Sequence, residues 1–272
     1  MKNKQMMIIG IVVALLVLAG IGGGIYMMTR PPEEVKQEVQ TAEKPKRRTR
    51  TEQYDNITID KRPYIDISPD ASGRNVTITF HNIKERASSV DYELEYQAGE
   101  LLQAAFGTIE IDNLPINKEI LLGSRSAGGA TTYHEDVKGG TLVTRFKGGE
   151  QYAFKSDWNF INNSKRLTTI TSKDEKFELK GPDIGKLRLV IITNSPGYPE
   201  ELPGTPVSAL YAVSAPTALS GEATATITLS EEAPDAKIAA WDGNTWETVA
   251  TEVDGTSATA EAALGQLYVA VK

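Results

Sequence analysis

The sequence predicts one N-terminal transmembrane helix followed by an all-β body of two antiparallel, Ig-like β-sandwich modules. Three observations predict this fold class. Residues 6–28 contain no charged residue, apolar residues alternate with polar ones in many short segments after residue 54, and turn residues separate these segments. We therefore divide the chain into a tail (1–5), a transmembrane helix (6–28), a disordered polar linker (29–53) and two β-sandwich domains (54–200 and 201–272).

The transmembrane helix is predicted from the length of the apolar run. With a rise of 1.5 Å per residue, a helix over residues 6–28 extends about 35 Å and can cross a bilayer. A cleaved signal peptide and a buried core helix are the alternatives. The first needs a small-residue cleavage site, whereas this run ends in Ile25-Tyr26-Met27-Met28, and the second is normally shorter. We expect an uncleaved anchor in the cell membrane.

The charges around the helix predict its orientation. Lys2, Lys4 and the terminal amine precede the helix, so positive-inside counting places the N-terminus in the cytoplasm and the β-body outside it. A basic cluster in the linker favours the opposite orientation, but it lies near the edge of the counting window. The cluster either contacts anionic headgroups or an acidic wall polymer, or is simply solvated. Its members are Lys44, Lys46, Arg47, Arg48 and Arg50.

The overall composition excludes several classes of function. A net charge of −7 argues against a general nucleic-acid-binding protein, which would be basic. The chain has no cysteine, so disulfides, thiol catalysis and thiolate metal sites are ruled out. This composition suits a bacterial or archaeal envelope protein.

In residues 54–200, the apolar residues recur with a period of two. Val76, Ile78 and Phe80 illustrate this pattern, which is typical of strands with one buried face. The continuous apolar run Leu187–Ile192 predicts a central strand. A turn at Gly99–Ala105 is the one segment that hints at helical periodicity. Gly123–Ala130 is expected to be a flexible exposed loop.

The C-terminal region contains the strongest local signal, Trp241-Asp-Gly-Asn-Thr-Trp246. Asp242-Gly243 predicts a tight turn between two strands that the flanking tryptophans brace. Trp241 and Trp246 are also the best candidates for ligand binding, because paired aromatic rings can stack on a sugar. The structural interpretation is that they stabilise the hairpin or fill a small core.

Three segments of this region resemble C-terminal β-sandwich modules of bacterial envelope proteins, in which a W-D-G-x-x-W hairpin precedes a last strand introduced by glycine. They are Pro216–Leu229, Trp241–Trp246 and Leu264–Val269. The layout of anchor, linker and β-modules is similar to that of uncharacterised single-pass surface proteins. The resemblance implies location and fold, and it implies no catalytic residue, because such modules usually act as spacers or accessory domains.

The sequence offers few residues for chemistry. His81 and His134 are the only histidines, and His134-Glu135-Asp136 lacks the spacing of zinc motifs. Asp66-x-Ser68-x-Asp70-x-Ser72 has the oxygen spacing of a calcium loop, but Ala71 replaces the required glycine, so a turn is expected. We expect the chain to bind no metal ion and no cofactor, and to have no enzymatic activity.

Together these patterns predict a membrane-anchored structural or protein-interaction module of the cell envelope. A carbohydrate- or wall-polymer-binding module is the alternative, and it requires Trp241 and Trp246 to form one exposed platform. An envelope hydrolase is a third hypothesis and requires two carboxylates facing each other in a cleft. The expected partners are the lipid bilayer and a wall polymer or envelope proteins.

Overall fold

The structure is a computed structural model that describes residues 57–272. The transmembrane helix expected at residues 6–28 and the linker expected at 29–53 lie outside this range. Within residues 57–272, no helix is long and apolar enough to cross a membrane. The helices here are two single 3₁₀ turns, η1 (Ile59–Lys61) and η2 (Ile184–Lys186).

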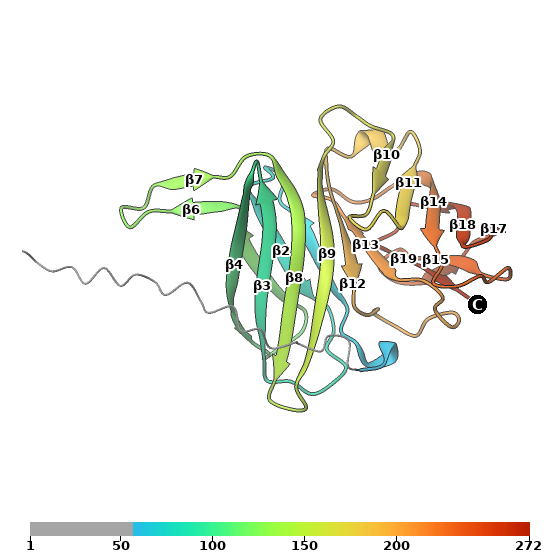
Figure 1. The fold of residues 1–272 in the computed structure, drawn as a ribbon, viewed down its shortest axis with the longest axis horizontal. Helices are drawn as coiled ribbons and strands as arrows, with labels where there is room; N and C mark the ends of the chain where they lie inside the picture. Colours follow the sequence, from blue (N-terminus) through green and yellow to red (C-terminus); the bar gives the residue numbers. More distant parts are fainter. Residues whose placement is uncertain (1–56) are drawn as a thin grey trace, which may run out of the picture. The chain divides into compact units, whose positions relative to one another are not determined.

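The described part of the chain is built around an antiparallel sheet of nine strands (Figure 1). Its strands bury alternate residues, as the period of two predicts. In spatial order they are β16 (Trp246–Thr248), β15 (Lys237–Trp241), β19 (Leu267–Val271), β13 (Leu210–Ser214), β12 (Leu189–Ser195), β9 (Tyr152–Asn162), β8 (Val137–Lys147), β3 (Ser89–Ala98) and β4 (Leu101–Glu110).

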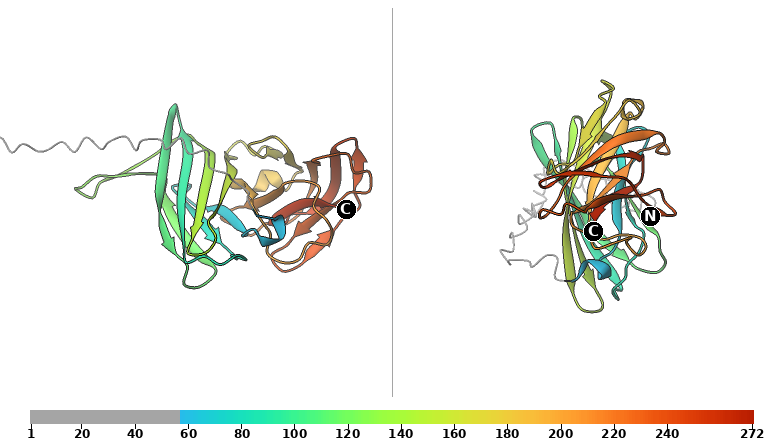
Figure 2. Two further views of the ribbon diagram at one scale, coloured as in Figure 1. Left: turned by 60° about the horizontal axis from the view of Figure 1, so that its bottom comes forward. Right: turned by 90° about the vertical axis from the view of Figure 1, so that its right-hand side faces the viewer.

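A sheet of three strands packs on one part of the nine-stranded sheet (Figure 2). Its strands are β1 (Ile65–Pro69), β2 (Asn75–Phe80) and β5 (Ile116–Leu121). The core between these sheets includes Ile65, Ile67, Val76, Ile78, Phe80, Leu94, Leu142, Phe146, Phe154 and Trp158.

A sheet of five strands encloses a second core with the other part of the nine-stranded sheet. Its strands are β10 (Thr169–Thr171), β11 (Phe177–Lys180), β14 (Glu222–Thr228), β18 (Ser257–Ala263) and β17 (Glu252–Asp254). This core includes Ile170, Phe177, Leu179, Val190, Ile192, Tyr211, Ala225, Ile227 and Tyr268. A third, smaller cluster around Tyr64, Tyr198 and Trp241 packs on the remaining apolar face of β13, β15 and β19.

Strand β12 contributes to both main cores. Ile191 lies in the first core, whereas Val190 and Ile192 lie in the second, and all three are fully buried. Successive side chains of a strand point to opposite faces, so a strand covered on both faces must be apolar throughout. The prediction of a central strand at Leu187–Ile192 is confirmed, because β12 is the fifth of nine strands.

The all-β, antiparallel class predicted from the sequence is confirmed for residues 57–272. The boundary expected at residue 200 falls between β12 and β13, which are hydrogen-bonded neighbours. Strands β10 and β11, from before that boundary, also pair with β14, from beyond it. Strand pairing therefore continues across the boundary, and residues 57–272 lie within one compact unit.

One local expectation was wrong and another holds in part. Gly123–Ala130 begins with β6 (Gly123–Arg125), which pairs with β7 (Thr131–Tyr133) in a two-stranded ribbon that Figure 1 shows extending away from the body. Residues 126–130, between these strands, form the exposed loop that the sequence predicts. Gly123 allows this pairing, because a Cβ there would lie 2.5 Å from the carbonyl oxygen of Thr132. Gly99–Ala105 is the turn and first half of β4: residues with good helix propensity form a strand because β3 pairs with all of β4.

Candidate interaction surface

Strand β4 is an edge strand whose outer side is open in the described part of the chain. It pairs with β3 along all ten residues without a shift in register. Gly99, with φ of +56°, closes the turn between the two strands. Alternate residues of an antiparallel edge strand direct their N–H and C=O groups away from the sheet. The outer side of β4 therefore presents a row of backbone donors and acceptors.

The inner face of β4 is held in place by the first core. Ala105 and Ile109 pack against that core. Gly107 lets the Tyr92 ring approach the strand, because a Cβ at this position would lie 2.8 Å from the Tyr92 hydroxyl. These contacts fix which side chains of β4 point to solvent.

Large apolar side chains are exposed along β4. Leu101, Leu102 and Phe106 are 66%, 64% and 77% exposed. We call these three side chains, together with the open backbone of β4, the edge surface. Within residues 57–272, six large apolar side chains are exposed, and five of them lie between residues 101 and 133. These five are the three on β4, Leu114 and Tyr133, and the sixth is Leu167. The apolar exposure is therefore concentrated around one hairpin and the ribbon that follows it.

The other sheet edges are protected by means that β4 lacks. Exposed edges are normally kept from pairing by shortness, lysine, proline or a bulge. The edge strands β10, β16 and β17 have three residues each, β1 ends in Pro69, and β5 carries Lys118. Strand β4 has ten residues, with no lysine, no proline and no bulge against β3. It is the longest edge strand of residues 57–272.

The hairpin of β3 and β4 is acidic. Residues 87–117 include six acidic residues and no lysine or arginine. Two of the acids are neutralised by β8: Asp91 pairs with Lys147, and Glu93 lies 3.4 Å from a guanidinium nitrogen of Arg145. Burial raises the pKa of Asp91, but hydrogen bonds from Lys147 and Thr108, together with the positive charges of Lys147 and Arg145, outweigh burial and leave the pKa below its usual value. The acids near the two ends of β4, Glu100, Glu110 and Asp112, form no ion pair with any other residue in the range 57–272.

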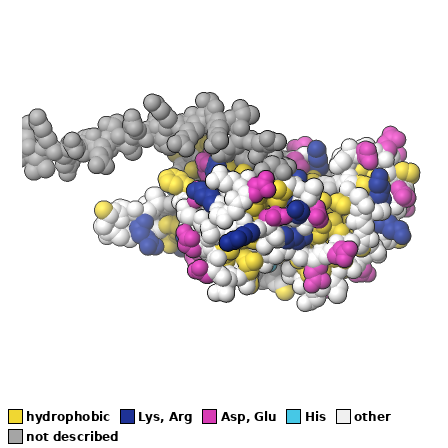
Figure 3. Space-filling view, turned by 90° about the horizontal axis from the view of Figure 1, so that it is seen from below, with side chains coloured by type: hydrophobic (Ala, Val, Ile, Leu, Met, Phe, Trp, Pro, Cys, Tyr) yellow, Lys and Arg dark blue, Asp and Glu magenta, His cyan; other side chains and the backbone are white. Residues whose placement is uncertain are grey.

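Figure 3 shows the side of the molecule that lies at the bottom of Figure 1. There, acidic and basic side chains are interspersed, and apolar side chains form small separate groups among them. Scattered exposure of this kind is ordinary for a protein surface. The edge surface differs because its apolar side chains follow a single strand with acidic residues, unpaired within residues 57–272, near both of its ends.

The tryptophans that the sequence proposed as a ligand site lie at a hairpin, as predicted. Trp241 and Trp246 are direct partners across β15 and β16, with ring centroids 5.5 Å apart. The Asp242 carboxylate accepts hydrogen bonds from the backbone N–H groups of Asn244 and Thr245, which fixes the turn. Trp241 is 5% exposed and belongs to the third cluster, against which Trp246 packs. The two rings therefore do not form an exposed platform.

The basic cluster proposed to contact lipid or wall polymer lies outside the described residues. Its members are Lys44, Lys46, Arg47, Arg48 and Arg50.

A buried polar cluster that the sequence did not suggest joins β1, β2 and β13. The carboxylate of Asp66 lies 3.2 Å from Nε2 of His81 and accepts a hydrogen bond of 3.0 Å from the hydroxyl of Ser214. The Tyr64 ring stacks on His81 with centroids 4.3 Å apart. The carboxylate stands between the serine and the histidine, so the imidazole is not placed to take the serine proton. This geometry links strands and does not activate a nucleophile.

The remaining residues considered for chemistry have local roles. His134 lies in the loop after β7, where Nδ1 is 2.9 Å from the Tyr96 hydroxyl. Asp70 accepts hydrogen bonds from Ser72 and from the backbone of Arg74, so it holds the turn before β2 that the sequence predicts. Within residues 57–272, no group of three or more His, Asp or Glu side chains is placed to hold a metal ion.

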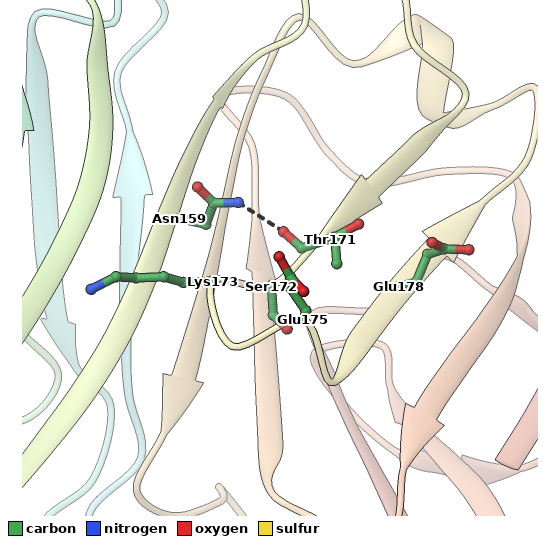
Figure 4. A pocket seen from close by; sticks show the side chains of 6 residues that line it. All are labelled: Asn159, Thr171, Ser172, Lys173, Glu175 and Glu178. Atoms are coloured by element: carbon green, nitrogen blue, oxygen red, sulfur yellow. Dashed lines mark hydrogen bonds between the residues drawn. The ribbon is translucent and has the colours of Figure 1, made fainter. Parts of the chain in front are cut away.

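A hollow in the described residues is open and polar (Figure 4). It has a volume of about 490 Å³ and lies between β9 and the hairpin of β10 and β11. The Asn159 amide donates to the carbonyl of Thr171 (2.8 Å) across it. The Lys173 ammonium donates to the carbonyl of Gly140 (2.8 Å) and to Asp157 (3.1 Å). Asn159 and Lys173 therefore attach the hairpin to the nine-stranded sheet.

Beside this hollow, Asp174 fastens the same hairpin from the other side. Its carboxylate accepts hydrogen bonds from Ser172, from Asn194 on β12 and from the Tyr211 hydroxyl on β13. Burial raises the pKa of Asp174, but these hydrogen bonds outweigh burial and lower the pKa below its usual value. Asp174 is thus a structural carboxylate that stays ionised at neutral pH.

Comparison of the chain with protein-family models, with curated proteins and with solved structures gives no match.

The sequence carries a signal for the edge surface. Leu101-Leu102-Gln103-Ala104-Ala105-Phe106 contains apolar residues at positions of both parities, which a half-buried strand would not need. Such a run, next to a partner strand with clean alternation, indicates a strand that exposes apolar residues to solvent. The absence of lysine and arginine between residues 87 and 117 is a second sign.

Proposed function

We propose that this chain is a non-catalytic protein-interaction module of the cell envelope. Residues 6–28 anchor it in the membrane, residues 29–53 space the β-body from the bilayer, and the body lies outside the cytoplasm as two β-sandwiches that share β12. The observation that supports an interaction role is the edge surface. A long, unprotected edge strand with exposed apolar side chains is a template for pairing with another chain.

Two further features support binding over catalysis. The polar clusters in the described residues have their groups engaged in joining strands, as Asp66 and Asp174 illustrate. Trp241 is buried, which removes the main support for the alternative of a carbohydrate- or wall-binding platform. An interaction at β4 needs no enclosed cleft, since an edge strand is recognised through its backbone.

The location is tested by protease shaving of intact cells, with an antibody to the β-body as probe. We expect the body to be removed while a cytoplasmic marker survives. A cytoplasmic body would survive in intact cells and in cells with a permeabilised outer layer, and it would be cleaved only after lysis. That result would contradict the proposal.

The interaction is tested by extracting the chain from its native membranes in a mild detergent and measuring its size by native electrophoresis. We expect a complex that the substitution Phe106→Lys releases and that the control Leu167→Lys leaves intact. Both positions carry exposed apolar side chains, but only Phe106 lies on β4. Identical migration of the two variants and the wild type would contradict a role for the edge surface.

A further inference from the structure

We infer that the edge surface accepts an extended strand of a partner protein, apolar at its centre and carrying lysine or arginine near both ends. This inference rests on the proposed function and names its partner class. Three features of the hairpin of β3 and β4 determine that class: the open backbone, the position of the apolar side chains and the sign of the charges.

The open backbone selects an extended segment. Partners that add to a sheet edge bond through main-chain N–H and C=O groups, which a helix uses internally. Strand β4 is ten residues long and has a regular register against β3, so an added strand could pair along its whole length. At about 3.4 Å per residue this length is roughly 34 Å, which is longer than an average strand.

The side chains of β4 then place the apolar part of the partner. Leu102 and Phe106 point to the same face, because they are four residues apart on one strand, and both are largely exposed. Residues directly opposite on a neighbouring strand contact each other with Cβ atoms about 5 Å apart. Apolar residues at alternate positions in the middle of the partner strand would therefore cover Leu102 and Phe106.

The charges specify the ends of the partner strand. Glu100 precedes β4 and Glu110 ends it, so acidic groups flank the apolar centre on both sides. Basic side chains at both ends of an added strand would lie next to them. Opposite charges on neighbouring strands stabilise a pair, and like charges destabilise it.

The same charges argue against a second copy of the chain as the occupant. Pairing β4 with the β4 of another molecule would bring together two hairpins, each with six acidic residues and no basic residue in residues 87–117. Only Asp91 and Glu93 of these acids are neutralised by ion pairs with β8. A partner of opposite charge avoids this repulsion and is also steered to the surface at low salt.

The test uses the full-length chain in detergent micelles and a fluorescent peptide of alternating design, Lys-Thr-Lys-Thr-Val-Thr-Val-Thr-Val-Thr-Lys. One control peptide replaces each lysine by glutamate. A second control keeps the charge but replaces the fourth and eighth residues by proline, which cannot donate to a strand ladder. Anisotropy measures binding, and hydrogen exchange followed by mass spectrometry measures protection of residues 101–110.

We expect the lysine peptide to bind and to slow hydrogen exchange within β4. Its affinity should fall at high salt. The proline peptide and the glutamate peptide should bind about tenfold more weakly or not at all. The first lacks main-chain hydrogen bonds to β4, and the second lacks favourable charge pairing with the acidic ends of β4. The double substitution Glu100→Lys and Glu110→Lys should weaken binding of the lysine peptide about tenfold, whereas Leu167→Ser should leave the affinity unchanged. Equal binding of the lysine and proline peptides, or unchanged exchange of β4, would overturn the inference.

Two further outcomes identify other occupants. Sedimentation of the free chain as a dimer that Phe106→Lys dissociates would show that a second copy occupies the edge surface. Binding of the peptide only after neutralisation of Lys44, Lys46, Arg47, Arg48 and Arg50 would show that the chain's own basic cluster occupies it. Either result overturns a separate basic partner. If no peptide binds but Phe106→Lys still releases the native complex, the partner class is wrong and the proposed function stands.

Discussion

Asp66 and Ser214 lie 148 positions apart in the sequence and are joined by a hydrogen bond of 3.0 Å. The Asp66 side chain is 14% exposed and Ser214 is buried. Asp66 belongs to the small sheet of the first core, and Ser214 ends a strand that supplies the second. The bond therefore links the two halves of the body.

Loss of the Ser214 hydroxyl should destabilise the whole protein. We expect Ser214→Ala to lower the free energy of unfolding by about 1–3 kcal/mol, because it leaves a largely buried carboxylate oxygen without its donor. Urea denaturation measures this change. Ser72→Ala is the control, since Ser72 also donates to a carboxylate but at an exposed turn, and a smaller effect is expected there. An equal effect of both substitutions would refute the linking role of Ser214.

Truncation of either face of β12 should destabilise the body as one unit. Ile191 and Ile192 are adjacent and fully buried, but they lie in different cores. We expect Ile191→Ala and Ile192→Ala each to lower the free energy of unfolding by about 2–5 kcal/mol. Each should shift a single unfolding transition that circular dichroism and tryptophan fluorescence both report. Two separate transitions, each moved by only one of the substitutions, would show that the cores unfold independently.

The stabilising effect of Asp174 should depend on pH. Because its pKa is lower in the folded protein than in the unfolded chain, ionised Asp174 stabilises the fold above the unfolded pKa of about 3.9. This stabilisation is lost as the pH falls through the folded pKa. The difference in unfolding free energy between the wild type and Asp174→Asn should therefore be constant from pH 7 to pH 5 and shrink below about pH 4.

Denaturation of both proteins at a series of pH values measures this difference. Asp254→Asn, at an exposed position of a hairpin, is the control substitution. A difference that stays constant down to pH 3 would contradict the role assigned to Asp174.

The sequence predicted the parts of the fold that depend on local pattern. Alternation at Val76, Ile78 and Phe80 identified a strand with one buried face, and the uninterrupted run before Ile192 identified the strand buried on both faces. The Trp241–Trp246 hairpin was predicted because its turn carries its own signal in Asp242. These features need no knowledge of distant contacts.

The features that the sequence did not reveal depend on distant residues. The cluster of Asp66, His81 and Ser214 forms only when β1 and β13 meet, and nothing near Ser214 in the sequence indicates it. Continuation of the nine-stranded sheet across residue 200 depends on pairing between β12 and β13, which a turn-rich segment obscured. The edge surface was missed because Leu101–Ala105 has helix-forming residues whose strand conformation is imposed by β3.

The central claim is that β4 is occupied by a partner in the cell, and thiol accessibility tests it most directly. The chain has no cysteine, so Phe106→Cys provides a unique thiol on β4 and Leu167→Cys provides a matched exposed control. The substitutions should change the free energy of unfolding by no more than about 0.5 kcal/mol, because both sites are on the surface. The measurement is the rate of maleimide labelling in native membranes and after purification in detergent.

We predict that the thiol at position 106 reacts about tenfold more slowly in native membranes than in the purified protein, as expected for a largely occupied site. The thiol at position 167 should react at similar rates in both. Equal rates for position 106 in the two preparations would show that β4 is open in the cell, and this result would contradict the account.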